Sequence, residues 1–97
     1  MESFFYTVRI DGDAEHALRK FPKQDRTRIS ENIETLARDP RPDGCKKIKG
    51  MENLYRIRVG DYRVVYSIQD RILLVLVIRI ARRKDVYRNI SKLEPHS

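Results

Sequence analysis

The apolar positions of the chain follow first the period of a strand and then that of two helices. Over residues 4–10 every second residue is apolar, which predicts a strand with one buried face. Apolar residues then recur at three- and four-residue spacing, which predicts two consecutive amphipathic helices. Asp11 or Asp13 can cap the first, and Pro22 suits the first position of the second. The two stripes consist of Ala14, Ala17, Leu18 and Phe21, then Ile29, Ile33, Leu36 and Ala37.

A turn-rich segment, residues 39–44, ends the second helix, and the pattern after it is that of a sheet. Because almost no loop separates the two helices, we expect them to form an antiparallel hairpin. Residues 54–59 and 62–68 flank Gly60 and Asp61, a glycine-first pair that suits a type II′ hairpin turn. Residues 72–80 are an almost unbroken apolar run, as in a central strand covered on both faces.

These elements predict one α+β domain over residues 1–97. Its order is an N-terminal strand, an antiparallel helix hairpin and a three-stranded antiparallel meander that completes one sheet. Val86, Ile90 and Leu93 allow a short C-terminal helix after the meander. No apolar run is long enough to span a membrane. One cysteine, Cys45, excludes an internal disulfide, and without a secretory leader we expect a cytoplasmic protein.

The charged residues are distributed unevenly along the chain. The chain has a net charge of +7, yet residues 1–45 carry 8 basic and 9 acidic side chains, whereas residues 46–97 carry 13 basic and 5 acidic ones. The excess of positive charge therefore lies wholly in the predicted meander and in the residues after it. Such segregation indicates a polyanionic partner, with a merely solubilising surface as the alternative.

The Gly60-Asp61 turn fixes the register of the hairpin and so places its arginines. Arg58 faces Arg63 across the two strands, and Arg56 shares their face. Like charges directly opposite on a sheet are destabilising. Either these arginines splay into water or meet carboxylates from the helices, or they form a preformed anion site. Guanidinium suits phosphate because its planar fork donates in parallel and keeps its charge.

Other basic residues converge on the same region. The antiparallel strand after Tyr62 should return beside the Gly60-Asp61 turn and deliver Arg82, Arg83 and Lys84 there, with Tyr87 just beyond. Upstream in the sequence, three lysines lead into the same sheet: Lys46, Lys47 and Lys49. Cations beside an aromatic ring are what single-stranded RNA requires, for its backbone and its bases.

Other chemistry is poorly supported by the sequence. His16 and His96 lack partners at metal-ligand or catalytic spacing, and we expect both on the surface. Cys45 is expected to serve packing, as are the strand tyrosines Tyr55, Tyr62 and Tyr66. There is no glycine-rich phosphate loop, acidic cluster or zinc spacing, so no metal or other cofactor is expected.

Two segments of the chain carry a recognisable motif: one runs from Lys46 through YRIRVGDYRVVY to Tyr66, and the other runs from Val77 to Tyr87 and contains RRKDVY. Both segments resemble the RelE family of bacterial and archaeal toxins. The first is typical of the whole RelE/ParE superfamily, and the basic residues plus tyrosine at the end favour the ribonuclease branch. The helix hairpin fits as well, so the resemblance covers nearly the whole chain and implies a RelE-like fold.

The resemblance implies a ribosome-dependent, metal-independent endoribonuclease, an mRNA interferase that stops translation. Its 2′-hydroxyl chemistry leaves a cyclic phosphate and a free 5′-hydroxyl. By position, Arg56 and Arg58 stand where relatives carry lysines that activate the 2′-hydroxyl, and Arg63 stands at a phosphate-binding arginine. Arg83 matches the arginine that stabilises charge or protonates the leaving oxygen, and Tyr87 the tyrosine that stacks on the substrate. RNA-binding roles fall to Lys46, Lys47, Lys49, Arg82 and Lys84.

The chain also departs from the family pattern. Position 82 is arginine where many relatives have histidine, and Arg56 and Arg58 replace lysines. Because the pKa of arginine lies above about 12, these residues are poor general bases and are expected to act as fixed charges.

The resemblance also implies partners. These are a RelB-like antitoxin from an adjacent gene, the ribosome and mRNA, operator DNA only through the antitoxin, and no membrane. Two other functions stay open: a ParE-like inhibitor of DNA gyrase that cuts nothing, and an inactive basic module that binds RNA or ribosomes.

Overall fold

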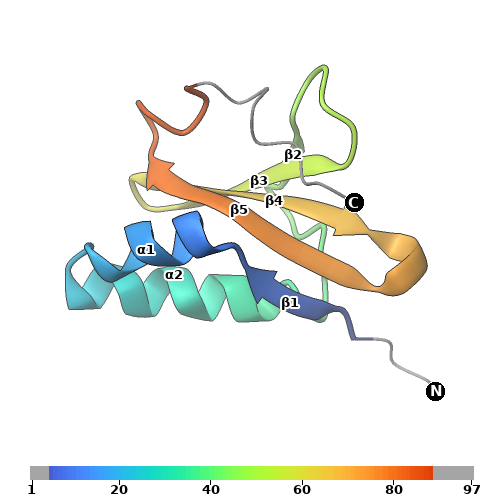
Figure 1. The fold of residues 1–97 in the computed structure, drawn as a ribbon, viewed down its shortest axis with the longest axis horizontal. Coiled ribbons are helices and arrows are strands. Elements are labelled where there is room, and N and C mark those ends of the chain that lie inside the picture. The colour runs from blue at the N-terminus through green and yellow to red at the C-terminus, as the bar shows by residue number, and fades with distance from the viewer. Residues whose placement is uncertain (1–4, 89–97) are drawn as a thin grey trace.

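The computed structural model describes residues 5–88 and consists of a five-stranded sheet with two helices on one face (Figure 1). In chain order the elements are β1 (Thr7–Ile10), α1 (Gly12–Arg19), α2 (Lys23–Thr35), β2 (Lys46–Lys47), β3 (Leu54–Val59), β4 (Tyr62–Gln69), the 3-10 turn η1 (Asp70–Ile72) and β5 (Leu74–Arg82). The α+β class and the order of elements are as predicted. The short β2 is an additional strand.

The strand order in the sheet is β1-β5-β4-β3-β2. All neighbours are antiparallel except β1, which runs parallel to β5 with Thr7 opposite Leu74. The helix hairpin lies between β1 and β2 in sequence and covers one face of the sheet (Figure 1). The opposite face, called the outer face below, is covered in part by residues 83–88, which turn back after β5 (Figure 1).

The main core lies between the helices and the sheet. Its deepest side chains come from α2, β4 and β5 and include Ile29, Tyr66 and Val77, each fully buried. The predicted helix stripes supply this core, and Tyr6, Val8 and Ile10 of the first strand pack against it. A second, smaller cluster lies on the outer face and consists of Met51, Leu54, Val65, Ile78 and Val86.

Several predicted boundaries need correction. Pro22 occupies the position before α2 rather than its first residue, and Asp11 stands before α1 without a side-chain capping bond. Ile72 lies in η1 and is 63% exposed, so the last strand begins only at Leu74 and extends to Arg82. The physical reason is Leu73, whose φ of 52° turns the chain and breaks the apolar run.

The end of the chain also differs from the sequence-based expectation. Residues 83–88 form turns, and Val86 is fully buried on the outer face rather than on the side of a described helix. Ile90, Leu93 and His96 lie outside the described residues, as does Phe4 of the first predicted strand.

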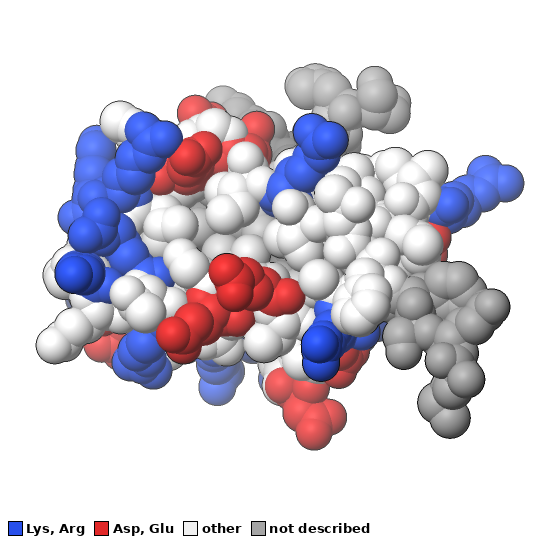
Figure 2. All heavy atoms as spheres, turned by 90° about the horizontal axis from the view of Figure 1, so that it is seen from below, with Lys and Arg blue, Asp and Glu red and all other residues white. Residues whose placement is uncertain are grey.

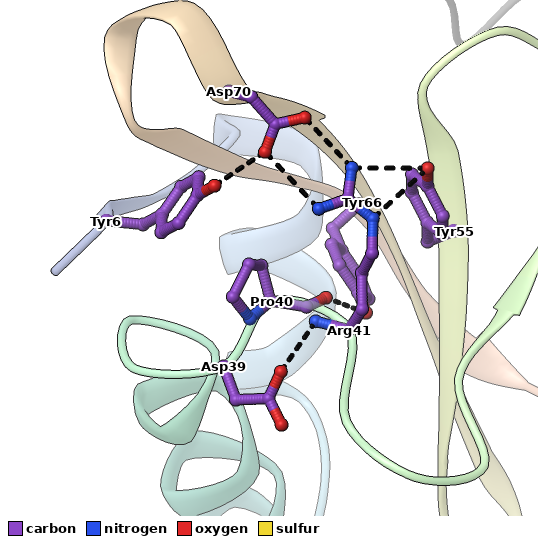
Figure 3. A network of polar contacts seen from close by, with 7 residues as sticks. All are labelled: Tyr6, Asp39, Pro40, Arg41, Tyr55, Tyr66 and Asp70. Carbon is purple, nitrogen blue, oxygen red and sulfur yellow. Dashed lines mark hydrogen bonds and ion pairs between the residues drawn. The ribbon is translucent and has the colours of Figure 1, made fainter. Parts of the chain in front are cut away.

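A polar network holds the segment between α2 and β2 against the sheet, at the end of β4 remote from the β3–β4 turn (Figure 3). Arg41 donates to both carboxylate oxygens of Asp70, at 3.3 and 2.9 Å, and its guanidinium lies 5.1 Å from the centre of the Tyr55 ring. Tyr6 donates its hydroxyl to the same carboxylate at 2.5 Å. The buried Tyr66 hydroxyl donates to the carbonyl of Pro40 at 2.8 Å. Together these contacts fasten residues 40 and 41 to β3, β4 and η1.

Between residues 5 and 88, no helix has the length and apolar character needed to cross a membrane.

Candidate functional site

The hairpin of β3 and β4 places three arginines on the outer face of the sheet. Its register is the predicted one, with Arg58 opposite Arg63, Val59 opposite Tyr62 and Arg56 opposite Val65. Gly60 has a φ of 58°, as the first position of a type II′ turn requires, which is why glycine suits this position. The hydrophobic residues that alternate with the arginines point to the helix side and join its core. Because successive side chains of a strand point to opposite faces, the arginines lie on the outer face.

Arg63 is fixed by the turn that precedes it. Its Nη1 donates to the carbonyl oxygens of Gly60 and Tyr62, at 3.0 and 2.9 Å. The pKa of Arg63 is lowered, first by burial of its guanidinium and then by the positive charges of Arg58, Arg56 and Arg83. Arg58, Arg56 and Arg83 thus lie near enough to Arg63 for their charges to disfavour its charged form. A negative ligand would relieve this repulsion.

The end of β5 returns beside the hairpin turn, as the sequence predicted. Arg82 pairs with Tyr62, and the backbone N–H of Arg83 donates to the carbonyl of Asp61 at 3.0 Å. Val86 then inserts into the outer-face cluster and is fully buried. The Arg83 backbone and the Val86 side chain are thus both fixed, and they hold the exposed residues 83–85 next to the hairpin arginines.

Tyr87 completes the cluster. The residue is 47% exposed, while its hydroxyl accepts a hydrogen bond from Nε of Arg56 at 3.0 Å. Arg56 is only 7% exposed, and its buried Nη1 has no hydrogen-bond partner among the described residues. A buried donor without a partner is costly, because its hydrogen bonds to water are lost and not replaced.

The structure therefore brings together all five residues predicted to carry chemistry: Arg56, Arg58, Arg63, Arg83 and Tyr87. It spreads the predicted RNA-binding residues more widely. Arg82 lies over the Tyr62 ring at 5.3 Å, on the helix side of the sheet. The register pairs Lys46 with Arg56 and Lys47 with Tyr55, so these two lysines face opposite sides of the sheet. Lys49 and Lys84 are exposed in turns.

Charge on the helix side is mixed rather than uniformly positive (Figure 2). Acidic side chains gather over the middle of the helices, and basic ones gather at the end of the molecule where the α1–α2 connection and the end of β5 lie (Figure 2). Exposed Glu15, Glu31 and Glu34 belong to the helices. The helix layer (Figure 2) thus differs from the hairpin, where Arg56, Arg58 and Arg63 share one face.

Sequence reasoning missed one residue of this region, Arg79 of β5. Its guanidinium donates to the carbonyl oxygens of Val86 and Arg88, and so contacts the backbone on either side of Tyr87. The sequence held a weak signal, a charged residue inside an otherwise apolar strand. What this arginine binds could not be read from that signal, because both carbonyls belong to an irregular turn.

Other candidate groups stay apart from the cluster. His16 is exposed on α1, and Cys45 is half-buried with its Sγ 3.2 Å from the Tyr66 hydroxyl. Within the described part of the chain, no group of three His, Cys, Asp or Glu side chains is placed to hold a metal ion. The arrangement can bind a polyanion, neutralise charge on a phosphate and offer a phenol to a neighbouring group.

The chain is similar to toxins of known families over most of its length. Residues 6–87 match the model of a family described as the ParE toxin of the type II toxin–antitoxin system parDE. A Methanocaldococcus jannaschii protein named as toxin RelE1 is 35% identical, with 87% of this chain and 97% of the relative covered. Toxin RelE of Mycobacterium tuberculosis is 36% identical, with coverages of 86% and 87%. The RelE–RelB complex of Pyrococcus horikoshii matches with a TM-score of 0.74, 30% identity and coverages of 82% and 97%.

Proposed function

The chain belongs to the RelE/ParE superfamily of toxins from type II toxin–antitoxin systems, and from this premise we propose that it is a RelE-type endoribonuclease acting on ribosome-bound mRNA. The observation that carries the proposal is the cluster of Arg56, Arg58, Arg63 and Arg83 with Tyr87 on one sheet face. A phosphate with a neighbouring base would use both the clustered guanidinium groups and the exposed aromatic ring.

In the proposed reaction the 2′-oxygen of a nucleotide attacks the adjacent phosphorus, and the bond from phosphorus to the 5′-oxygen breaks. The products are a 2′,3′-cyclic phosphate and a 5′-hydroxyl, so the 2′-proton leaves and the 5′-oxygen gains one. The negative charge on the phosphorane is greatest midway, and fixed guanidinium groups stabilise it most at that point. Arg56 contributes a positive charge just beneath the surface of the outer face, and Arg63 is held rigid by the turn carbonyls.

Each arginine has a distinct place in this proposal. Arg63 and Arg56 lie deepest and bind the scissile phosphate, while the exposed Arg58 and Arg83 lie at its margins. Tyr87 presents its exposed ring to a base. Arginine remains protonated at neutral pH, so none of these residues serves as a general base. The proposed acceleration rests on electrostatics and on orientation of the RNA by the ribosome.

A RelB-like antitoxin is the proposed control on this activity. The Pyrococcus horikoshii relative was solved as a complex with RelB. A segment that folds on binding can cover a large surface at modest affinity for its size, which suits a cover for the outer face. We propose that the chain acts in the cytoplasm, where ribosomes and mRNA are available, and that any operator contact is made by the antitoxin.

The test is cleavage of a defined mRNA on purified programmed ribosomes by the purified chain. We expect a single-turnover cut in the ribosomal A site, with a cyclic phosphate on one product and a 5′-hydroxyl on the other. A message with a 2′-O-methyl group at the cleaved nucleotide is the matched control and should stay intact. No cleavage of the unmodified message, or products with other ends, would contradict the proposal.

The alternative is a ParE-like inhibitor of DNA gyrase. One observation favours it, namely that the family model matched by residues 6–87 is described as the ParE toxin. A supercoiling assay with purified gyrase separates the two functions. Inhibition of gyrase together with intact mRNA would favour the alternative, and cleavage without inhibition would favour the ribonuclease.

A further inference from the structure

Arg79 lies in one cross-strand row with Arg56. Arg56 pairs with Val65 on β4, and Val65 pairs with Arg79 on β5. A register shift between Val65 and Tyr66 makes Ile78 the extra residue of β5, so that Arg79 shares the outer face with its two partners in the row. The two arginines therefore flank the buried Val65 and approach the segment after β5 from two sides.

The contacts of Arg79 are to backbone rather than to carboxylates. Its Nη1 donates to the carbonyl oxygen of Val86 at 3.1 Å and to that of Arg88. These two carbonyls bracket Tyr87. Partial burial lowers the pKa of Arg79, and the charge of Arg88 adds to this effect. A guanidinium placed in such surroundings is costly unless its hydrogen bonds are satisfied, and here they are satisfied by one short stretch of chain.

Without Arg79 the position of Tyr87 would depend on few contacts. Among residues 5–88, Val86 otherwise anchors the segment by its side chain, and the Tyr87 hydroxyl has the bond from Arg56 as its one hydrogen bond. The backbone N–H groups of Asp85 and Arg88 close local turns, to Arg82 and Asp85 at 2.9 and 3.1 Å, but those bonds do not tie the segment to the sheet. The hydrogen bonds from Arg79 do, because the guanidinium belongs to β5.

We propose that Arg79 is a positioning residue, which fixes the backbone on both sides of Tyr87 and so holds its ring and hydroxyl beside the arginine cluster. The inference rests on the proposed ribonuclease function and deepens it. Arg79 has no contact with RNA in this account and acts through Tyr87. Its effect should therefore fall on the chemical step rather than on the binding of the ribosome.

The first experiment measures, without RNA, whether Arg79 restrains the backbone around Tyr87. Amide hydrogen exchange is compared between the wild type, Arg79→Met and the matched control Arg71→Met, which removes an exposed arginine from η1 at the far end of the sheet. In Arg79→Met we expect the amides of Asp85 and Arg88 to exchange on the order of tenfold faster, because the segment loses two hydrogen bonds to the sheet. Strand amides should be unchanged, and Arg71→Met should match the wild type. Unchanged exchange in Arg79→Met would overturn the inference.

The second experiment measures single-turnover cleavage on programmed ribosomes as a function of toxin concentration. In Arg79→Met the maximal rate should fall by about 10- to 100-fold, since a displacement of about 1 Å in a reacting group can have an effect of this size. The half-saturating concentration should change by less than about threefold, because the phosphate-binding arginines are intact. Arg79→Lys, which keeps the charge and some donors, should recover part of the lost rate.

Three outcomes would overturn the inference. One is fast exchange in Arg79→Met with an unchanged maximal rate, which would show that the backbone contacts of Arg79 do not affect the chemical step. Another is a loss found wholly in the half-saturating concentration, which would make Arg79 a general positive charge. The third is a wild type that cuts no RNA at all, which refutes the proposed function itself and is recognised before any variant is compared.

Discussion

Nε of Arg56 donates a hydrogen bond to the hydroxyl of Tyr87 across 3.0 Å, and so joins the middle of β3 to the turn that comes after β5. The two residues are 31 positions apart in sequence, and nothing in the local pattern of either segment requires that they meet. The contact orients the phenol over the most buried guanidinium of the outer face. It leaves the Tyr87 proton free to be donated elsewhere, because the hydroxyl acts as the acceptor in this bond.

Replacement of Arg83 or Tyr87 by alanine should abolish growth arrest when the chain is expressed without antitoxin. Both side chains are exposed and lie outside the two apolar clusters, so Arg83→Ala should change the free energy of unfolding by no more than about 1 kcal/mol. Tyr87→Ala also removes the acceptor of the buried Arg56 Nε and should cost about 1 to 3 kcal/mol. Growth after induction and thermal unfolding of each variant provide the measurement.

The matched control is Arg9→Ala, which removes an exposed arginine from β1. It should arrest growth as the wild type does. Antitoxin binding should persist in all three variants, which shows that they fold. Full toxicity of Arg83→Ala and Tyr87→Ala would remove both residues from the site.

Binding to programmed ribosomes should weaken steeply with salt. The outer-face arginines are close enough to lower the pKa of Arg63, and each that meets a phosphate releases counterions. If four such contacts form, affinity should fall by about 50-fold between about 50 and 200 mM monovalent salt at constant magnesium. Sedimentation binding assays at several salt concentrations would measure this slope.

The same assay distinguishes the outer face from the rest of the surface. Arg58→Met should reduce the slope of the logarithmic plot by about one contact, whereas Arg71→Met should leave it unchanged. A flat wild-type plot would show that the hairpin arginines do not meet phosphate when the chain binds.

The hairpin register is the part of the site that the sequence alone could establish. A two-residue turn at Gly60 and Asp61 determines every pairing of β3 with β4, and alternation then places the arginines on one face. Such local rules also predicted the helix hairpin, because the apolar spacing of each helix can be counted directly. For the same reason the return of β5 beside the turn could be inferred from its antiparallel connection.

Features set by long-range or irregular backbone geometry could not be predicted in this way. Ile72 looked like part of a strand, yet the left-handed conformation of Leu73 breaks the run, and leucine gives no warning of it. The extra residue Ile78 shifts the alternation of side chains in the rest of β5 by one residue, and this places Arg79 on the outer face. The contacts of Arg79 depend on where an irregular turn ends, which is set by the packing of Val86.

The polar network around Asp70 should make stability depend on pH in the acid range. The pKa of Asp70 is lowered from an ordinary value of 3.8, first by its hydrogen bonds from Arg41 and then by that from Tyr6. A carboxyl with a lowered folded pKa stabilises the protein above its unfolded pKa and ceases to do so as the pH falls through the folded value. Wild type should therefore lose stability relative to Asp70→Asn on going from about pH 6 to about pH 2.5.

Thermal denaturation of both proteins across this range provides the measurement, and only their difference is used, because other carboxyls titrate as well. At pH 6 the midpoint of wild type should be the higher of the two, and the gap should close at the acid end. Asp43→Asn, an exposed carboxylate without a hydrogen bond or ion pair among the described contacts, is the control and should show no such trend. A gap that is absent at pH 6 would mean that the network makes no contribution to stability.

The five clustered residues include no histidine and no carboxylate, the groups that most often act as a general base. Arginine does not titrate near neutrality, and the only histidine among residues 5–88, His16, is exposed on α1. Single-turnover cleavage should therefore change little between about pH 6 and about pH 7. It should also persist when divalent ions are buffered at a level that keeps ribosomes intact, since no described cluster could retain a metal.

Arg58 then acts as a fixed charge, and its removal should affect the chemical step more than binding. In Arg58→Ala the maximal single-turnover rate should fall by about 10- to 100-fold, a larger factor than the rise in the half-saturating concentration, because a fixed charge acts most strongly when the phosphorane forms. His16→Ala is the matched control and should cleave at the wild-type rate. If His16→Ala loses cleavage, or if Arg58→Ala retains the full rate, the chemistry does not take place on the outer face. The gyrase inhibitor and the inactive RNA-binding module would then be the better accounts of this chain.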